Sequence, residues 1–219
     1  YSLCTAPFEK ALKVAIKRVE GGKFSGYANE MLKAGDELEV LPPTGKFHSP
    51  LDAQNKKNYL AFAAGSGITP VISIIKATLQ AEPESHFTLV YGNRSRASII
   101  FFEELEGLKN KYLNRFSLVH LLSREVPDSP LNYGKINDEK LGELAKMTDF
   151  SKIDDFFVCG PESMIFCVTG YLENKGIEKR RIHFELFNTP GPQQQTGGPE
   201  NADGNEAGAS SAVTGILDG

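Results

Sequence analysis

The sequence predicts a doubly wound α/β domain, built on a parallel sheet and preceded by the C-terminal part of a small antiparallel β-barrel domain. From residue 58 onward, apolar runs of strand length alternate with amphipathic segments of helix length, which is the order of a parallel sheet with helices on its faces. A glycine turn, Gly65-Ser66-Gly67, leads from the first strand into a helix. Before residue 50, residues 11–19 alternate apolar and polar side chains, as a half-buried strand does.

Each element has its own local signal. In the α/β part, strands are expected at 59–63, 86–91, 116–122, 155–159 and 181–184, and helices at 70–81, 100–112, 137–145 and 161–175. In the β part, Leu38 and Val40 repeat the alternation of residues 11–19, with a short helical stretch at 28–33 between them. A polar stretch at 51–57 marks the boundary. Residues 1–54 are thus expected to form the partial β-barrel and residues 55–188 the α/β domain.

Residues 189–219 differ in composition from the rest of the chain. They contain no lysine or arginine, and ten of the 31 residues are glycine or proline. Such a segment buries too little apolar surface to order itself, so a disordered linker is predicted. Because a linker connects two parts and the chain begins at Tyr1 rather than methionine, the chain is expected to be a fragment of a longer protein.

Composition excludes several classes of function. The net charge is −4 with both signs interspersed, so nucleic acid has no basic surface to bind. No apolar run approaches the roughly 20 residues of a membrane-spanning helix, and a soluble protein is expected. The three cysteines form no Cys-x-x-Cys pair, which favours a reducing, cytoplasmic location. The four histidines lack the spacing of metal ligands, so no metal site is predicted.

The glycine turn is the first candidate site. A strand followed by glycines and a helix start directs free backbone N–H groups toward a phosphate, and Thr69 and Pro70 fit the first positions of a helix. The dinucleotide fingerprint Gly-x-Gly-x-x-Gly is incomplete, however, because Pro70 replaces the third glycine. Taken alone, the turn is as typical of an ordinary βα connection as of a dinucleotide site. A Walker-type loop is excluded because no Gly-Lys-Ser/Thr follows.

Two further loops are expected at the same edge of the sheet, where ligands of doubly wound domains bind. After the second strand, Arg94 and Arg96 stand where an acidic residue would bind a ribose 2′-hydroxyl. Arginines there accommodate a 2′-phosphate, so NADPH is favoured over NADH; the alternative is that both are solvated loop charges. After the fourth strand comes Cys159-Gly160-Pro161. Considered alone, Cys159 is more typical of a small buried residue than of a reactive thiol.

A series of motifs in this order resembles the ferredoxin–NADP reductase superfamily, and most of all its oxygenase reductases with a C-terminal plant-type [2Fe–2S] domain. The resemblance covers residues 1 to about 188. The motifs are Tyr1-Ser2-Leu3-Cys4, Gly22-Lys23-Phe24-Ser25, Pro43-Thr44-Gly45-Lys46-Phe47, Gly65-Ser66-Gly67-Ile68-Thr69-Pro70, Tyr91-Gly92-Asn93-Arg94, Cys159-Gly160-Pro161-Glu162-Ser163-Met164 and Phe184-Glu185-Leu186-Phe187.

The resemblance implies roles for these residues. Tyr1 and Ser2 would contact the flavin ring, with Cys4 in the same motif, and Gly22, Lys23, Phe24 and Ser25 would hold the FAD pyrophosphate. Gly65 and Gly67 would admit the NADPH pyrophosphate. Thr69 would line the nicotinamide pocket together with the loop Cys159, Gly160 and Pro161, and Ile68 and Pro70 belong to the same cofactor-binding motif as Thr69. Glu185 and Phe187 would close the other side of the flavin. Cys159, Thr69 and Glu185 are the residues expected beside the reacting rings.

The function expected from the resemblance is that of a flavin-dependent oxidoreductase. Electrons would pass from NADPH through FAD to a [2Fe–2S] centre in a missing C-terminal domain, and on to an oxygenase or other acceptor protein. Because the first part of the flavin barrel is absent from these residues, this chain alone is expected to bind FAD weakly. Two alternatives stay open: a flavin reductase without an iron–sulfur domain that serves a separate acceptor, and a nucleotide-binding redox sensor without turnover.

Overall fold

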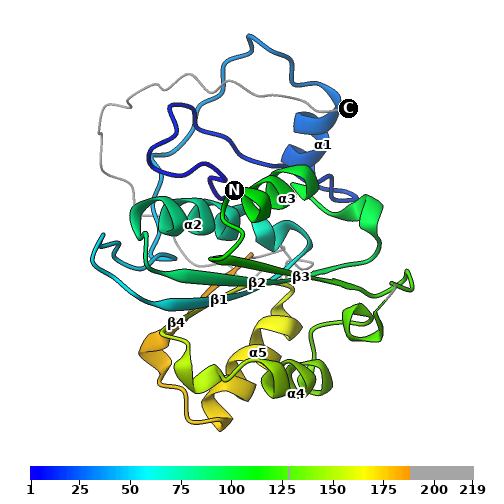
Figure 1. Ribbon diagram of the computed structural model, residues 1–219. Coiled ribbons are helices and arrows are strands. Elements are labelled where there is room, and N and C mark those ends of the chain that lie inside the picture. The colour runs from blue at the N-terminus through cyan, green and yellow to red at the C-terminus, as the bar shows by residue number, and fades with distance from the viewer. Residues whose placement is uncertain (128, 188–219) are drawn as a thin grey trace, which may run out of the picture.

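A five-stranded parallel sheet forms the centre of the computed structural model, which describes residues 1–127 and 129–187 (Figure 1). The strand order is β3-β2-β1-β4-β5. The strands are β1 (Asn58–Ala64), β2 (His86–Asn93), β3 (Phe116–Leu122), β4 (Asp155–Gly160) and β5 (Ile182–Leu186). The order in which strands are added to the sheet reverses between β1 and β4, which lie side by side. This switch point is where doubly wound sheets bind ligands, and the topology confirms the predicted doubly wound α/β class.

Four helices cover the two faces of the sheet. They are α2 (Ile68–Ala81), α3 (Phe102–Lys111), α4 (Asp138–Met147) and α5 (Glu162–Asn174). Figure 1 shows α2 and α3 on one face and α4 and α5 on the other. The first strand is buried on both sides because it lies in the middle: Leu60 and Phe62 face the α4–α5 core, whereas Tyr59 faces the α2–α3 core. This two-sided burial explains why the strand has a continuous apolar sequence.

The helix boundaries follow local backbone chemistry. The helix expected from residue 100 begins at Phe102, because Phe101 has a φ of 62° and so cannot belong to a right-handed helix. At the start of α4, the Asn137 side chain accepts a hydrogen bond from the Lys140 backbone N–H at 2.9 Å, which satisfies one free donor of the first turn.

A buried carboxylate joins the linker before β1 to the amino edge of the sheet. Glu82 has no exposed surface. Its carboxylate accepts hydrogen bonds from the Tyr59 hydroxyl at 2.8 Å, the Ser85 hydroxyl at 2.7 Å and the Asn55 amide at 2.7 Å. Beside it, the Arg115 guanidinium donates to the backbone carbonyls of Leu79, Glu82 and Ser85. These bonds fix the end of α2 against the strands.

The N-terminal part differs from the prediction. Residues 1–57 contain the helix α1 (Lys23–Glu30) and one isolated antiparallel bridge between Leu3 and Val14, and no strand. The strands expected at 11–19 and around Leu38 are therefore wrong. Their alternation has no partner strand to pair with among the described residues, and Leu12, Val14 and Val40 stay exposed. The helix expected at 28–33 begins earlier, directly after Gly22.

The first residues of the chain are attached to the α/β part as well as to residues 13 and 14 of the N-terminal segment. Cys4 belongs to the α2–α3 core. The Ser73 hydroxyl of α2 donates to the Thr5 carbonyl at 2.7 Å. Lys76, also on α2 and almost buried, forms ion pairs with Glu9 at 2.7 Å and Glu104 at 3.0 Å. These contacts place Tyr1 and Ser2 near the sheet.

Two general features concern only the described ranges. None of the helices there is long and apolar enough to cross a membrane, and no three His, Cys, Asp or Glu side chains gather closely enough to hold a metal ion. Cys4, Cys159 and Cys167 are free thiols. The linker predicted at 189–219 lies outside the described residues.

Candidate nucleotide and flavin site

The glycine turn and the β4 loop meet at the carboxyl edge of the sheet. β1 and β4 are hydrogen-bonded neighbours in which Ala63 pairs with Cys159, so the loops that follow them lie together. A side chain on Gly67 would overlap the Cys159 carbonyl and would come within 2.7 Å of the Gly160 nitrogen. On Gly160 it would come within 2.7 Å of the Met164 methyl. Gly67 is therefore required by packing against backbone, whether or not a ligand binds. At Gly160 the end of the Met164 side chain could move, and the Ala64 backbone nitrogen at 3.2 Å leaves little room.

Local hydrogen bonds hold the glycine turn in place. Gly65 has a φ of 53°, a conformation that costs a glycine little. Its carbonyl accepts a hydrogen bond from the Tyr91 hydroxyl of β2 at 2.9 Å, and the Thr69 hydroxyl donates to the Ser66 carbonyl at 3.0 Å. The side chains of Ile68, Thr69 and Pro70 are all buried, whereas Gly65 and Ser66 are partly exposed. The surface that a ligand can reach here is consequently mostly backbone.

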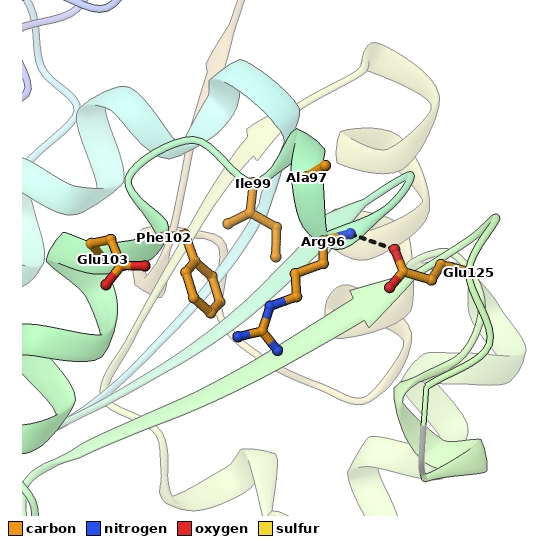
Figure 2. A pocket seen from close by; sticks show the side chains of 6 residues that line it. All are labelled: Arg96, Ala97, Ile99, Phe102, Glu103 and Glu125. Carbon is orange, nitrogen blue, oxygen red and sulfur yellow. Dashed lines mark hydrogen bonds between the residues drawn. The ribbon is translucent and has the colours of Figure 1, made fainter. Parts of the chain in front are cut away.

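The arginine loop after β2 borders a shallow depression of about 560 Å³. Figure 2 shows its lining residues, which are Arg96, Ala97, Ile99, Phe102, Glu103 and Glu125. The Arg96 guanidinium lies 4.5 Å from the centre of the Phe102 ring. The Arg96 backbone N–H donates to the Glu125 carboxylate at 2.7 Å. Arg94 is exposed and does not line this depression, so the structure places only one of the two predicted arginines there.

Of the lining residues, sequence reasoning had named only Arg96, and Glu125 is the one among the others that is hydrogen-bonded to it. It lies in the loop after β3, and β3 pairs with β2 in register so that Asn93 lies opposite Leu122. The loops after β2 and β3 therefore meet. The backbone N–H of Ser123 donates to the Asn93 carbonyl at 3.0 Å, and that of Arg124 donates to the Arg94 carbonyl at 2.8 Å. The signal that could have found Glu125 is its place just after the neighbouring strand.

Cys159 lies inside the core rather than on the surface of the site. Its side chain has no exposed area and belongs to the α2–α3 core. Burial, reinforced by the negative charge of Glu185, raises the pKa of the Cys159 thiol to about 12. The thiol is therefore neutral at physiological pH and is no nucleophile. The contact of Cys159 with a nicotinamide ring stays a prediction. The same holds for Pro161 in this loop.

Residues from the two ends of the described chain meet beside this edge. The Ser2 hydroxyl donates to the Glu185 carboxylate at 3.1 Å, although 183 positions separate the two residues. Glu185 in turn lies opposite Cys159 in the β4–β5 pairing. Through these contacts the structure brings together Ser2, Glu185 and Cys159, three residues that the sequence predicts around the flavin and the nicotinamide.

Exposed aromatic side chains accompany the Ser2–Glu185 contact. The rings of Tyr1 and Phe24 lie 5.4 Å apart, and Tyr1 is 71% exposed. Phe24 stands at the start of α1 beside the exposed Lys23, whereas Ser25 is buried and accepts a hydrogen bond from the Val19 backbone N–H at 3.2 Å. Phe187 is also exposed. Flat apolar faces beside a hydroxyl suit a planar ring with polar edges, so these residues fit a flavin.

The fold and these loops are those of a nucleotide-binding α/β domain of the reductase type. In agreement, residues 62–169 match the family model described as the oxidoreductase NAD-binding domain. The chain belongs to the ferredoxin–NADP reductase-type family, which confirms the resemblance drawn from the motifs.

Several known proteins are similar to this chain. One component of the 1,2-phenylacetyl-CoA epoxidase of Escherichia coli is 45% identical over 192 residues, which are 87% of this chain and 54% of that protein. The ferredoxin reductase component of 3-ketosteroid-9-alpha-monooxygenase from Rhodococcus rhodochrous is 37% identical over 190 residues, or 86% of this chain and 50% of that protein. The chain thus spans about half the length of the curated relatives it matches.

Solved structures show the same fold. Amycolatopsis cytochrome P450 reductase GcoB superposes with a TM-score of 0.72 at 26% identity, over 84% of this chain and 55% of that one. Ferredoxin–NADP⁺ reductase from Plasmodium falciparum, solved with 2′P-AMP, superposes with a TM-score of 0.67 at 26% identity, over 85% of this chain and 75% of that one.

Proposed function

We propose that this chain is the nucleotide-binding part of a flavin reductase that passes electrons from NADPH through FAD to a [2Fe–2S] centre, and from there to an oxygenase partner. The observation that supports it best is the juxtaposition at one edge of the sheet. The Gly65–Gly67 turn packs against Cys159 and Gly160, and the Ser2–Glu185 contact adjoins Cys159 through the strand register. A nucleotide on the loops would have its nicotinamide beside the flavin residues.

Each loop would bind a different part of the nucleotide. The partly exposed backbone of Gly65 and Ser66 would bind the pyrophosphate at the start of α2, where free N–H groups and the helix dipole favour negative charge. Arg96 would bind the 2′-phosphate of the adenosine half, with its guanidinium already positioned on Phe102. Arg94, exposed on the same loop, would add a second positive charge from outside the depression.

The flavin ring would be held by Tyr1, Ser2, Phe24 and Glu185. When bound, FAD accepts two electrons from the nicotinamide and releases them singly. Because the Ser2 hydroxyl donates its hydrogen to Glu185, its oxygen keeps lone pairs that can accept a hydrogen bond from a ring N–H. Tyr1 and Phe24 supply apolar surface, and Lys23 supplies positive charge for a pyrophosphate.

Cys159 contributes by being small, neutral and buried. A neutral thiol adds no charge beside the nicotinamide, and its core position fixes the backbone that carries Gly160. Thr69 contributes similarly, since its hydroxyl is bonded to Ser66 and holds the turn. Hydride transfer needs no general base in this arrangement. Proximity and orientation would therefore carry the catalysis.

The acceptor side of the proposal rests on the relatives. The Rhodococcus protein is named as the ferredoxin reductase component of a monooxygenase, and the E. coli protein as part of an epoxidase. An oxygenase is the partner that these names support. A cytoplasmic location is part of the proposal and is supported by the three free cysteines, which suit a reducing compartment.

The test is a reduction experiment on the native protein at its full length, supplied with FAD under anaerobic conditions. NADPH should bleach the absorbance of the oxidised flavin. Arg96→Gln should raise KM for NADPH about tenfold or more, because a charge-assisted contact with the 2′-phosphate is lost, while KM for NADH changes less than about twofold. Arg180→Gln, on the surface near β5 and paired with Glu178, is the matched control. Absence of flavin reduction would contradict the proposal, and so would an equal increase in KM for NADPH and for NADH in Arg96→Gln.

A further inference from the structure

Glu82 carries a buried carboxylate that forms no ion pair within the described ranges. Arg115, beside it, donates to backbone carbonyls instead, including that of Glu82 itself. The carboxylate is held by four neutral donors, which are the Tyr59 hydroxyl, the Ser85 hydroxyl, the Asn55 amide and, at 3.3 Å, the Asp52 backbone N–H. Burying a carboxylate without a cation is costly, so each donor must lie at a defined place around it.

The four donors come from two parts of the chain. Tyr59 on β1 and Ser85 just before β2 belong to the α/β part. The other two lie in the connecting segment, residues 50–57, which leads into β1. Glu82 itself is the residue that directly follows α2. Its carboxylate therefore attaches the connecting segment to the C-terminal end of this helix.

Residues 10–46 depend on attachments at their two ends. In the part of the chain that the structure describes, no hydrogen bond or ion pair joins these residues to β1 or to anything after it. Before them, residues 1–9 are bonded to α2 by a hydrogen bond and an ion pair. After them, the Phe47 ring packs against the sheet and the connecting segment is bonded to Glu82. Both ends are thus bonded to α2 or to the residue that follows it.

The same helix follows the glycine turn. α2 begins at Ile68, directly after the Gly65–Gly67 turn, and has 14 residues, so it spans about 21 Å. The pyrophosphate site of the proposed function lies at one end of α2, and Glu82 lies at the other. Figure 1 shows the N-terminal part of the chain, with α1, on the side of the sheet that α2 and α3 cover. α2 is therefore a common support for the glycine turn and for the segment that carries α1.

We propose that Glu82 is a positioning residue, which holds the connecting segment on the end of α2 and thereby fixes residues 10–46 relative to the nucleotide loops. The inference rests on the proposed function and deepens it. FAD would be held in part by residues 22–25 and the nicotinamide by the loops, and hydride transfer depends steeply on the distance between the two rings. Glu82 lies at the amino edge of the sheet, away from both, and acts through the connecting segment.

The test breaks and then restores one contact in the native protein at its full length, supplied with FAD. Asn55→Asp sets a second carboxylate against that of Glu82, in place of an amide that donates to it at 2.7 Å, and the two charges repel. The double variant Asn55→Asp/Glu82→Gln restores the contact with its roles reversed, because the new amide donates to the new carboxylate while its oxygen still accepts from Tyr59 and Ser85. Gln54→Ala, an exposed position in the same turn, is the matched control.

Two measurements are made on each variant. Anaerobic stopped-flow absorbance gives the limiting rate of flavin reduction at saturating NADPH and the dissociation constant for NADPH, and hydrogen exchange gives the mobility of residues 52–57. We expect Asn55→Asp to lower the limiting rate about fivefold or more and to leave the dissociation constant within about twofold. Exchange at residues 52–57 should become about tenfold faster. The double variant should return both quantities to within about twofold of the wild type, and Gln54→Ala should change neither.

The results that would overturn the inference differ from those that would overturn the proposed function. If Asn55→Asp keeps the limiting rate of the wild type, whether or not its exchange is faster, Glu82 has no positioning role and the proposed function stands. A rate that stays low in the double variant refutes the role of the Asn55–Glu82 contact in the same way. If NADPH does not reduce the flavin of the wild type, the proposed function fails and the positioning role fails with it.

Discussion

Gly67 is the residue whose replacement most directly tests the packing of the site. A methyl group there would overlap the Cys159 carbonyl and would approach the Gly160 nitrogen to 2.7 Å, whereas real Cβ contacts are rarely shorter than 3.4 Å. The obstacle is backbone at the end of β4, so the turn and β4 must move apart until the overlap with the Cys159 carbonyl is relieved. Forced overpacking of this kind costs about 3 kcal/mol. We therefore expect Gly67→Ala to lower the melting temperature by about 6–12 °C for a domain of this size.

The assay is thermal and urea unfolding of the purified chain, followed by circular dichroism. Gly107→Ala is the matched control, because Gly107 lies within α3 and a methyl group there meets no atom within 4 Å. Alanine is the better helix former, so this control should be stabilised by about 0.5–1 kcal/mol. If Gly67→Ala unfolds within about 0.5 kcal/mol of the wild type, a value ordinary for a harmless substitution, the contact between the two loops is not as described.

Three other substitutions test the packing around the sheet. Lys76→Met removes the ion pairs with Glu9 and Glu104 and should cost about 1–2 kcal/mol in urea unfolding, since both carboxylates keep some solvent; an unchanged midpoint would contradict this. Arg115→Met removes the guanidinium donor of three backbone carbonyls, of which only that of Glu82 keeps another donor, the Ser85 N–H at 3.2 Å, and should cost about 2–3 kcal/mol; a melting-temperature loss below about 2 °C would refute this. Burial lowers the pKa of His120, so the unfolded chain takes up a proton before the folded chain, and stability should fall as pH drops below about 6.5. His120→Phe should remove that part of the slope between pH 7.5 and 5.5, and equal slopes would exclude His120 as its source.

The α/β part could be predicted from the sequence because its signals are local and agree with one another. Buried central strands such as β1 have continuous apolar sequences, and the Gly65–Gly67 turn marks the passage from strand to helix. The predicted start of α3 was too early because nothing in the sequence indicates the left-handed conformation of Phe101. The alternation at 11–19 misled because an alternating pattern shows that a strand could form, and only a partner strand makes it form.

Residues of the site were predictable from the sequence only where a single loop was enough to identify them. Arg96 follows β2 directly and was found by its position after that strand. Glu125 was missed because its meeting with Arg96 depends on β3 lying beside β2, and strand order is a property of the whole sheet. The contact between Ser2 and Glu185 likewise depends on the docking of the first residues on α2. Here the family resemblance grouped residues that no local pattern connects.

A nicotinamide nucleotide bound as proposed would lie across the carboxyl edge of β1, β2 and β4. Amide chemical-shift mapping of the chain by NMR, during titration with NADP⁺, tests this placement residue by residue. We expect the largest shifts at Gly65, Gly67, Arg96 and Gly160, and no shift at Gly142, which lies within α4 on the opposite face. Absence of shifts at saturating NADP⁺, or shifts confined to the α4–α5 face, would contradict it.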